Sequence, residues 1–151
     1  MRRRCAYTFI ELMIVVLVMG ILAGVAAPRY MQALDYYRVE SAAKRIAADF
    51  RYARQKAIDD AAERKVVFDL ASDSYELLSV GNLDRQANAY IVSPANEGYA
   101  VDITAADFGG QATCTFSHLG DAADAGSVTI TSGGESRTIT VELPRTISIS
   151  P

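Results

Sequence analysis

A single carboxylate, Glu11, stands at the start of the most apolar stretch of this 151-residue sequence. The next 17 residues, 12–28, contain no charged or hydrogen-bonding side chain. A carboxylate inside a membrane span costs about 2.5–3.5 kcal/mol on insertion scales, so it needs a cationic partner. If the chain is cut after Ala6, the new α-amino group of Tyr7 is a cation at the same depth. It can then pair with Glu11 of a neighbouring copy.

The other reactive side chains form no recognisable catalytic or metal-binding pattern. His118 is the only histidine, and Cys114, four residues before it, is expected to be a small buried residue. The sequence has no phosphate-binding loop, G-x-S-x-G elbow or H-E-x-x-H zinc motif. Asp121 and Asp124 form an oxygen-rich turn, but two carboxylates are too few to predict a calcium site. We therefore predict a protein that is not an enzyme, with no catalytic residue, metal or cofactor.

The element that must position Glu11 is a membrane-spanning helix. Residues 7–27 number 21, which at about 1.5 Å per residue just spans a bilayer core about 30 Å thick. Arg2, Arg3 and Arg4 precede this segment and favour a cytoplasmic N-terminus. The alternative is a secretory signal peptide cleaved near residues 24–27. Glu11 inside its apolar region and Pro28 beside its cleavage site argue against that alternative.

A second helix segment, residues 29–64, is predicted to be amphipathic. Its apolar residues recur every three or four positions, at Tyr36, Val39, Ala43, Ile46, Phe50, Ala53 and Ala57. The opposite face is expected to be solvated and carries Arg38, Glu40, Arg45, Asp49, Arg51 and Lys56. This helix is therefore expected to cover a globular partner along one side.

From residue 65 onward the pattern changes to short β-rich runs. Strands are predicted at 65–70, 74–80, 99–104, 113–116, 127–131, 136–143 and 146–150, with 82–98 mostly irregular. Ser132-Gly133-Gly134-Glu135 indicates a hairpin turn. The predicted fold class is α+β, with a long transmembrane-plus-amphipathic N-terminal helix packed on a small antiparallel β-sheet head.

Charge is unevenly distributed along the chain. Residues 29–65 contain nine basic and six acidic side chains, whereas residues 66–151 contain three basic and eleven acidic ones. Nucleic-acid binding surfaces need clustered Lys and Arg. The distal part is therefore a poor electrostatic match for DNA or RNA.

The N-terminal arrangement resembles the class III signal of type IV prepilins and of type II secretion pseudopilins. In that family a short basic leader ends in a small residue, the mature chain starts with an aromatic residue, and its fifth residue is glutamate. Here residues 1–6 match the leader, Tyr7 the first mature residue, Glu11 the fifth and Pro28 the family's usual proline. The family usually has Gly and Phe at the positions held here by Ala6 and Tyr7, which are likewise a small residue before the cleavage site and an aromatic residue after it.

The resemblance extends along the chain to the GspH/FimT group of minor pseudopilins. Residues 50–58 (FRYARQKAI) are similar to the helix of that group, and residues 116–149 to its C-terminal sheet. Leu143-Pro144-Arg145-Thr146-Ile147 stands where that group has its turn before the last strand. The fold implied is type IV pilin-like.

The resemblance implies a mechanical function. Prepilin peptidase would remove residues 1–6 and N-methylate Tyr7, residues 7–28 would be the transmembrane and assembly helix, and Glu11 would guide incoming subunits by charge pairing. Gly20 and Gly24, four apart, would allow close helix packing or local flexibility with Pro28. Ordinary tolerance of glycine in a membrane helix, and a proline that marks the membrane exit, are the alternatives.

The function so implied is a minor structural subunit of a type II secretion pseudopilus or a type IV pilus, positioned at the tip to start assembly. It would be a single-pass inner-membrane protein, with a cytoplasmic N-terminus and a periplasmic β-rich head (65–151), and part of a filament after assembly. Expected partners are prepilin peptidase, other pilin-like subunits, the inner-membrane assembly platform and, before assembly, lipid. A minor pilin that receives DNA is the first alternative function, and a membrane-anchored periplasmic enzyme is a distant one.

Overall fold

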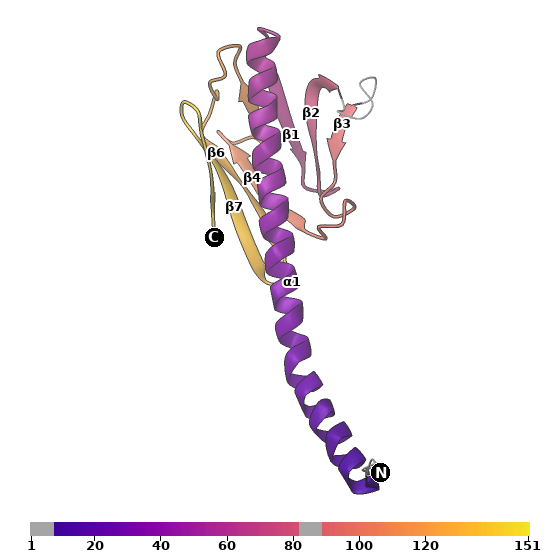
Figure 1. Ribbon diagram of the computed structural model, residues 1–151. Helices are drawn as coiled ribbons and strands as arrows, with labels where there is room; N and C mark the ends of the chain where they lie inside the picture. Colours follow the sequence, from indigo (N-terminus) through magenta and orange to yellow (C-terminus); the bar gives the residue numbers. More distant parts are fainter. Residues whose placement is uncertain (1–7, 82–88) are drawn as a thin grey trace, which may run out of the picture. The chain divides into compact units, whose positions relative to one another are not determined.

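The computed structural model describes residues 8–81 and 89–151, which contain one helix and eight strands (Figure 1). In chain order these are α1 (Phe9–Asp59), β1 (Arg64–Asp69), β2 (Ser74–Gly81), β3 (Ala89–Val92), β4 (Asp102–Phe108), β5 (Thr113–Phe116), β6 (Gly126–Ser132), β7 (Glu135–Glu142) and β8 (Thr146–Ser150). The chain divides into two compact units, Met1–Leu34 and Asp35–Pro151. We call the second unit the head.

In the first unit the described residues belong to α1, apart from Thr8, which precedes it. Residues 8–33 are exposed throughout, so no other part of the described chain covers this stretch of helix. Pro28 lies inside α1 without ending it. The long helix expected from the apolar run is confirmed from Phe9 onward.

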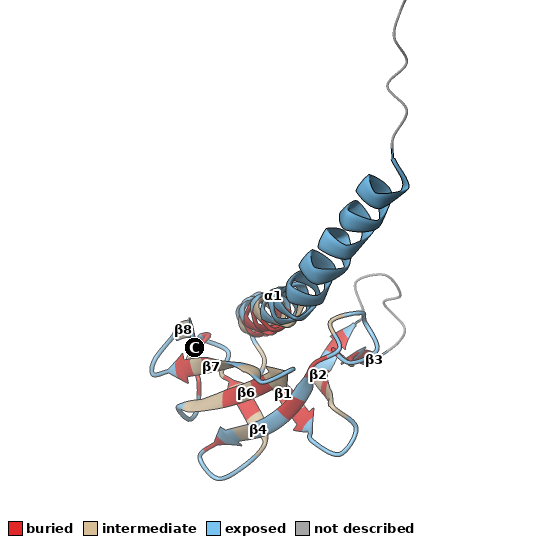
Figure 2. Cartoon of the chain, turned by 90° about the horizontal axis from the view of Figure 1, so that it is seen from below, coloured by how far each residue is buried: buried red, intermediate tan, exposed pale blue. Residues whose placement is uncertain are grey.

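In the head, the apolar face of α1 is buried against the sheets, as the three-and-four spacing predicts. Figure 2 shows the buried residues of α1 on the side that faces the strands. They are Val39, Ala42, Ala43, Ile46, Ala47, Asp49, Phe50, Ala53 and Ala57. Tyr36 is the exception among the predicted apolar positions, because 43% of it is exposed.

A hydrogen-bonded turn at the C-terminal end of α1 reverses the direction of the chain. The Ala61 N–H bonds to the Ile58 carbonyl and the Ala62 N–H to the Ala57 carbonyl, at 3.2 and 3.1 Å. Ala61 adopts a left-handed conformation, φ 47°, which glycine usually takes at a helix end of this kind. β1 then starts at Arg64 and runs back alongside α1 (Figure 1).

The strands form two antiparallel four-stranded sheets, in the orders β3-β2-β1-β5 and β4-β6-β7-β8. The antiparallel β-rich head is confirmed, with two sheets in place of the one small sheet expected. The predicted hairpin at residues 132–135 joins β6 to β7. Gly133 and Gly134 have φ angles of 57° and 92°, the pair of positive values that a tight hairpin turn requires.

Two strand predictions were wrong in position. β3 lies within the segment 82–98 that was expected to be mostly irregular, and residues 82–88 of that segment are outside the described residues. β4 begins at Asp102, three residues later than predicted, because Ala100 has a φ of 50° that interrupts an extended chain. The remaining strands agree with prediction to within one residue at each end.

The core of the head is centred on Phe50 of α1, which is fully buried. Its ring lies 5.8 Å from that of Phe68 on β1, 5.9 Å from Phe108 on β4 and 6.3 Å from Phe116 on β5, measured between centroids. These tilted and edge-on arrangements are the ones that aromatic pairs prefer. One helix residue therefore joins both sheets into a single core.

Candidate assembly site

Glu11 lies in the first turn of α1, where Thr8 caps the helix. The Glu11 N–H donates to both Thr8 Oγ1 and the Thr8 carbonyl, at 3.3 and 3.1 Å. Thr-x-x-Glu is the spacing of a capping box, and a negative side chain is favoured at a helix N-terminus. The Glu11 side chain is exposed, and its carboxylate has no ion-pair partner within residues 8–81 and 89–151. Ala6 and Tyr7, the predicted cleavage and methylation residues, lie outside the described residues.

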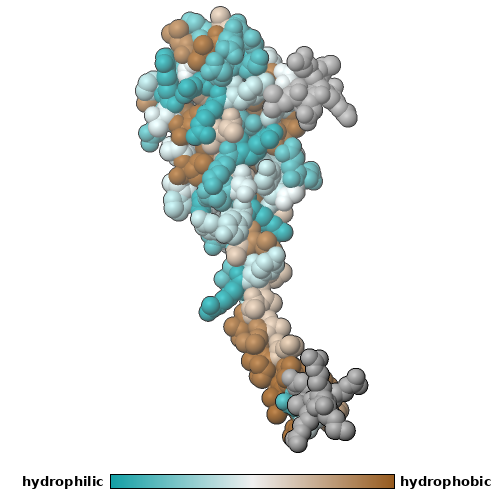
Figure 3. All heavy atoms as spheres, viewed as in Figure 1, coloured by the Kyte–Doolittle hydropathy of each residue, from teal (hydrophilic) through white to brown (hydrophobic). Residues whose placement is uncertain are grey.

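The surface that follows Glu11 is almost entirely apolar. Figure 3 shows this part of the helix in the colours of hydrophobic residues. Its large side chains from Phe9 to Val25 are between 42% and 78% exposed. Among the described residues, α1 is the one helix long and apolar enough to cross a membrane. Such a surface is stable only in lipid or against other apolar helices.

Within residues 8–81 and 89–151, no other part of the chain packs against Gly20 or Gly24. A Cβ built on either would meet no atom within 4 Å. α1 is continuous from Gly20 through Pro28. Close helix approach at the two glycines, and flexibility around Pro28, therefore remain predictions about the assembled state.

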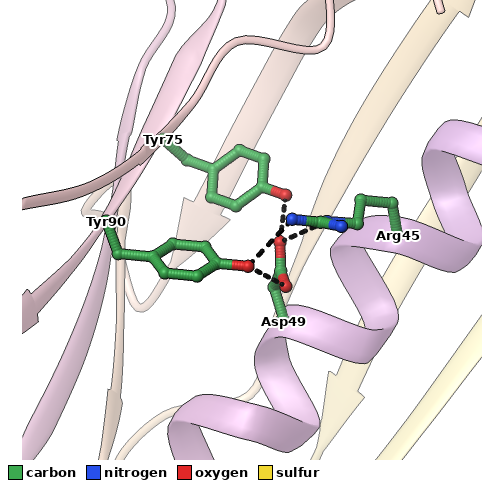
Figure 4. A network of polar contacts seen from close by, with 4 residues as sticks. All are labelled: Arg45, Asp49, Tyr75 and Tyr90. Carbon is green, nitrogen blue, oxygen red and sulfur yellow. Dashed lines mark hydrogen bonds and ion pairs between the residues drawn. The ribbon is translucent and has the colours of Figure 1, made fainter. Parts of the chain in front are cut away.

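The head contains a buried polar cluster that joins α1 to the first sheet (Figure 4). The Tyr75 hydroxyl donates to Asp49 Oδ2 at 2.5 Å, and the Tyr90 hydroxyl donates to Oδ1 at 2.9 Å. Arg45 donates through Nε to Asp49 Oδ2 at 3.2 Å and through Nη2 to the Tyr90 hydroxyl at 2.9 Å. We call these four residues the Asp49 cluster. It satisfies a carboxylate that the fold removes from water.

This cluster corrects the prediction that Asp49 lies on a solvated face. Asp49 is only 5% exposed. It stands three residues after Ile46 and four before Ala53, a spacing that places it at the border of the apolar stripe. That spacing, with Arg45 one turn earlier, is the signal from which its burial could have been inferred. Its tyrosine partners, on β2 and β3, have no signal in the helix sequence.

The two phenols of the cluster, Tyr75 and Tyr90, are expected to ionise at a higher pH than an ordinary tyrosine. Burial, and next the charge of Asp49, raise the pKa of Tyr90 to about 12, and the same two causes raise the pKa of Tyr75 further. Because these pKa values are higher folded than unfolded, the cluster stabilises the head fully below pH of about 10 and loses that contribution as the pH rises through 12. Absorbance titration should show that Tyr75 and Tyr90 form phenolates only at a pH of about 12 or higher, and that one such tyrosine is missing in Tyr90→Phe. If Tyr75 and Tyr90 ionised at the ordinary tyrosine pKa of about 10, the cluster would not form as described.

A second polar contact joins α1 to the second sheet. Arg137 on β7 donates through Nε to Glu40 Oε2 at 3.1 Å, and its guanidinium lies 4.9 Å above the ring of Tyr36. Lys44 also pairs with Glu40, at 3.1 Å. Hydrogen bonds from Lys44 and then Arg137 lower the pKa of Glu40. The exposed Tyr36 is thus a platform for Arg137 and not a core residue.

The remaining arginine of the C-terminal sheet is also paired. Arg145 donates through Nε to Asp121 Oδ1 at 2.6 Å, and its carbonyl accepts from Arg54 of α1 at 3.1 Å. Asp121 is therefore engaged by a cation and does not present a free carboxylate beside Asp124. Both arginines at this sheet, Arg137 and Arg145, are neutralised by acids of the same chain.

Cys114 is buried on β5, as expected, with 1% of its surface exposed. Burial, together with the nearby Asp124, raises the pKa of its thiol to about 12. His118 is exposed in the following loop. Within the described part of the chain, no group of three or more His, Cys, Asp or Glu residues is arranged to hold a metal ion.

Two family models match the chain. The model of the type II transport protein GspH matches residues 42–144, and that of the prokaryotic N-terminal methylation motif matches residues 1–27. The first covers most of the head, and the second covers the proposed leader and the apolar helix. A search of curated proteins finds no significant match.

Solved structures of similar fold include two crystal forms of the type IV minor pilin FimU of Pseudomonas aeruginosa. One has a TM-score of 0.54 at 14% identity and covers 78% of this chain and 91% of the FimU chain. The other has a TM-score of 0.51 at 15% identity and covers 74% and 92%. The type IV pilin-like fold is thereby confirmed. The apolar helix is typical of membrane anchoring, and the methylation motif fits processing by prepilin peptidase. The chain belongs to the GspH family of type II transport proteins, and it is a minor pseudopilin- or pilin-like structural subunit, not an enzyme.

Proposed function

We propose that this subunit is cleaved after Ala6, N-methylated on Tyr7 and incorporated into a type II secretion pseudopilus or a type IV pilus. The observation that carries the proposal is the exposed, uncharged helix surface that directly follows Glu11. In a soluble protein this surface would be an aggregation hazard. In a bundle of identical or related helices it becomes the core of a filament.

Glu11 is the proposed guide for assembly. Before incorporation the helix lies in the inner membrane, with the N-terminus in the cytoplasm and the head in the periplasm. The Tyr7 amine created by cleavage is the cation available to neutralise a glutamate at this depth, and pairing between adjacent subunits fixes their axial register.

The small residues behind Glu11 support close packing of these helices. Gly20 and Gly24 leave the α1 backbone accessible on one side, and helices approach closely where such residues face each other. Pro28 removes one backbone donor inside α1 and is the point at which the helix can bend. These three residues are proposed to adapt α1 to its neighbours.

We assign the subunit to the tip of the filament, where it helps to start assembly on the inner-membrane platform. Membership of a minor-subunit family and the fold shared with a type IV minor pilin support this position. A DNA-receptor function is not favoured, because Arg137 and Arg145 are already paired with Glu40 and Asp121. Phosphate contacts would have to break those pairs.

The mass of the mature protein tests the proposal directly. Protein recovered from membranes of the native host is expected to begin at Tyr7 and to carry one added methyl group, which intact-mass spectrometry measures in one experiment. Deletion of the prepilin peptidase gene should leave the full-length, unmethylated chain. A mature protein that begins at Met1 in the presence of the peptidase, or that has lost everything through Ala27, would exclude the filament function.

A further inference from the structure

Thr8 fixes the point at which α1 begins. A helical bond of 3.2 Å joins the Leu12 N–H to the Thr8 carbonyl, so Thr8 is the N-cap and Phe9 the first helical residue. The Glu11 N–H is bonded to both acceptors of Thr8, Oγ1 and the carbonyl oxygen. To extend the helix by one residue towards the N-terminus, the Glu11 N–H would have to bond to the carbonyl of Tyr7 instead. The cap therefore competes directly with extension of the helix.

Thr8 is also the only strong N-cap residue in this part of the sequence. The next Ser, Thr, Asn or Asp along the chain is Asp35, and none precedes Thr8. The six leader residues include three arginines and an alanine, which are good helix formers. In lipid an N–H without an acceptor is costly, so a helix without its cap is expected to satisfy its first N–H groups by adding the preceding turn. Loss of the cap would thus favour a helix that continues into the leader.

The bond that prepilin peptidase would cut is separated from Phe9 by Tyr7 and Thr8 alone. In its hydrolysis, water adds to the Ala6 carbonyl carbon, the bond to the Tyr7 nitrogen breaks, and the products are the Ala6 carboxylate and the Tyr7 ammonium. In a helix the Ala6 carbonyl would accept the Ile10 N–H and be surrounded by the side chains of neighbouring turns. Peptidases bind the chain in an extended form around the bond that they cut. The bond must therefore lie outside the helix when the peptidase binds.

We propose that Thr8 is a positioning residue for this cleavage. By ending the helix one residue after Tyr7, it keeps the Ala6–Tyr7 bond available to the peptidase. The inference rests on the proposed function, because that function includes cleavage after Ala6. Thr8 acts through the backbone conformation of the precursor and takes no part in the chemistry. Its role precedes assembly and is separate from the charge pairing assigned to Glu11.

Alanine and glycine at position 8 separate this role from direct recognition of the Thr8 hydroxyl. Both lack the hydroxyl, but glycine is nearly as good an N-cap as threonine and is poor inside a helix, whereas alanine is a poor N-cap and the best helix former. Thr8→Ala is expected to raise the KM for cleavage about fivefold and to leave kcat unchanged, because a smaller fraction of the precursor has the bond outside the helix. Thr8→Gly is expected to stay within about twofold of the unmodified chain in both constants.

The substrate for this test is the full-length precursor in detergent micelles with purified prepilin peptidase. Intact-mass spectrometry measures initial rates over a range of precursor concentrations. Thr8→Ser and Thr8→Asn retain a cap and should be cleaved like the unmodified chain. Met13→Ala, the matched control, introduces alanine one turn after the start of α1 and should leave KM unchanged. Hydrogen exchange of the uncleaved precursors is a second readout, in which amides ahead of residue 8 should exchange more slowly in Thr8→Ala than in Thr8→Gly.

Equal KM values for Thr8→Ala and Thr8→Gly would overturn this inference. If both were raised, the peptidase would recognise the hydroxyl itself, and if neither were raised, the cap would have no influence on cleavage. A lower kcat for Thr8→Ala at unchanged KM would also overturn it, because Thr8 would then contact the reacting groups. In each of these outcomes, cleavage of the unmodified chain after Ala6 leaves the proposed function standing. An unmodified chain that the peptidase does not cleave there would overturn both.

Discussion

Replacement of Asp49 by alanine is expected to lower the free energy of unfolding of the head by about 3 kcal/mol. The change removes the acceptor of two phenol hydroxyls and the counterion of Arg45. The Tyr75 hydroxyl accounts for most of the cost, because Tyr75 is 1% exposed and its hydroxyl cannot bond to water once the acceptor is removed. Arg45 keeps 38% of its side chain exposed and is partly rehydrated, which holds the cost near the lower limit for a broken buried pair.

A loss of this size is a large part of the 5–15 kcal/mol that stabilises a typical domain. The chain has no tryptophan, so the near-ultraviolet circular dichroism of its tyrosines reports on the head during thermal unfolding in detergent. Asp49→Asn retains one acceptor oxygen and should cost about half as much. Asp59→Ala removes an exposed acid at the end of the same helix and should change stability by less than about 0.5 kcal/mol. Equal midpoints for Asp49→Ala and Asp59→Ala would show that the cluster does not stabilise the head.

Asp49 also marks the limit of what the sequence could predict. The helix, its apolar stripe and the hairpin at Gly133-Gly134 have local signals, and their existence was predicted correctly. The amphipathic helix was predicted to extend to residue 64, but α1 ends at Asp59, and Tyr36 of the predicted stripe is exposed. Whether an acid is buried depends on partners that are distant in the chain, and the tyrosine partners of Asp49 are 26 and 41 residues away on β2 and β3. Asp49 was predicted on the solvated face. Its spacing at the border of the apolar stripe was a signal of burial, but the tyrosines that bury it have no local signal in the helix.

The misplaced strands have the same physical cause. β3 has four residues and is held by pairing with β2, for example Tyr75 opposite Val92, and a run this short is weak evidence of a strand in isolation. β4 passes through Ala105 and Ala106, which have low β propensity, and it exists because β6 lies beside it. In contrast, β5 and β8 are bounded by local turns and were predicted to the residue.

For the candidate assembly site, the sequence is more informative than the structure of a single chain. Glu11, Gly20, Gly24 and Pro28 were identified from the sequence, since their spacing along an apolar run is itself the signal. The structure of one chain adds the Thr8 cap and the exposure of the helix, but the expected partners of these residues belong to other subunits. Their functions are tested by assembly and not by the stability of the head.

Glu11→Lys is expected to reduce incorporation of the subunit into filaments about one hundredfold. The substitution replaces an attraction to the neighbouring Tyr7 amine by repulsion between two cations in a medium of low dielectric constant. The loss corresponds to roughly 2.5–3.5 kcal/mol, the cost of an uncompensated charge in a membrane span. The head should be unaffected, because Glu11 lies in the other compact unit. Immunoblots of sheared filaments, normalised to the membrane fraction, measure the ratio.

The controls separate charge pairing from loss of processing or helix capping. Glu11→Asp keeps the charge and should retain most of the incorporation, while Glu11→Gln removes the attraction without adding repulsion and should be intermediate. Thr8 caps the helix through the Glu11 backbone N–H, which all three variants keep, so the first turn of α1 is preserved in each. The mature mass of each membrane-bound variant confirms cleavage after Ala6 before incorporation is compared. If correctly cleaved Glu11→Lys entered filaments to the same extent as the unmodified chain, pairing with a neighbouring amine would be excluded. The role of Glu11 would then be limited to the capping box at the helix N-terminus.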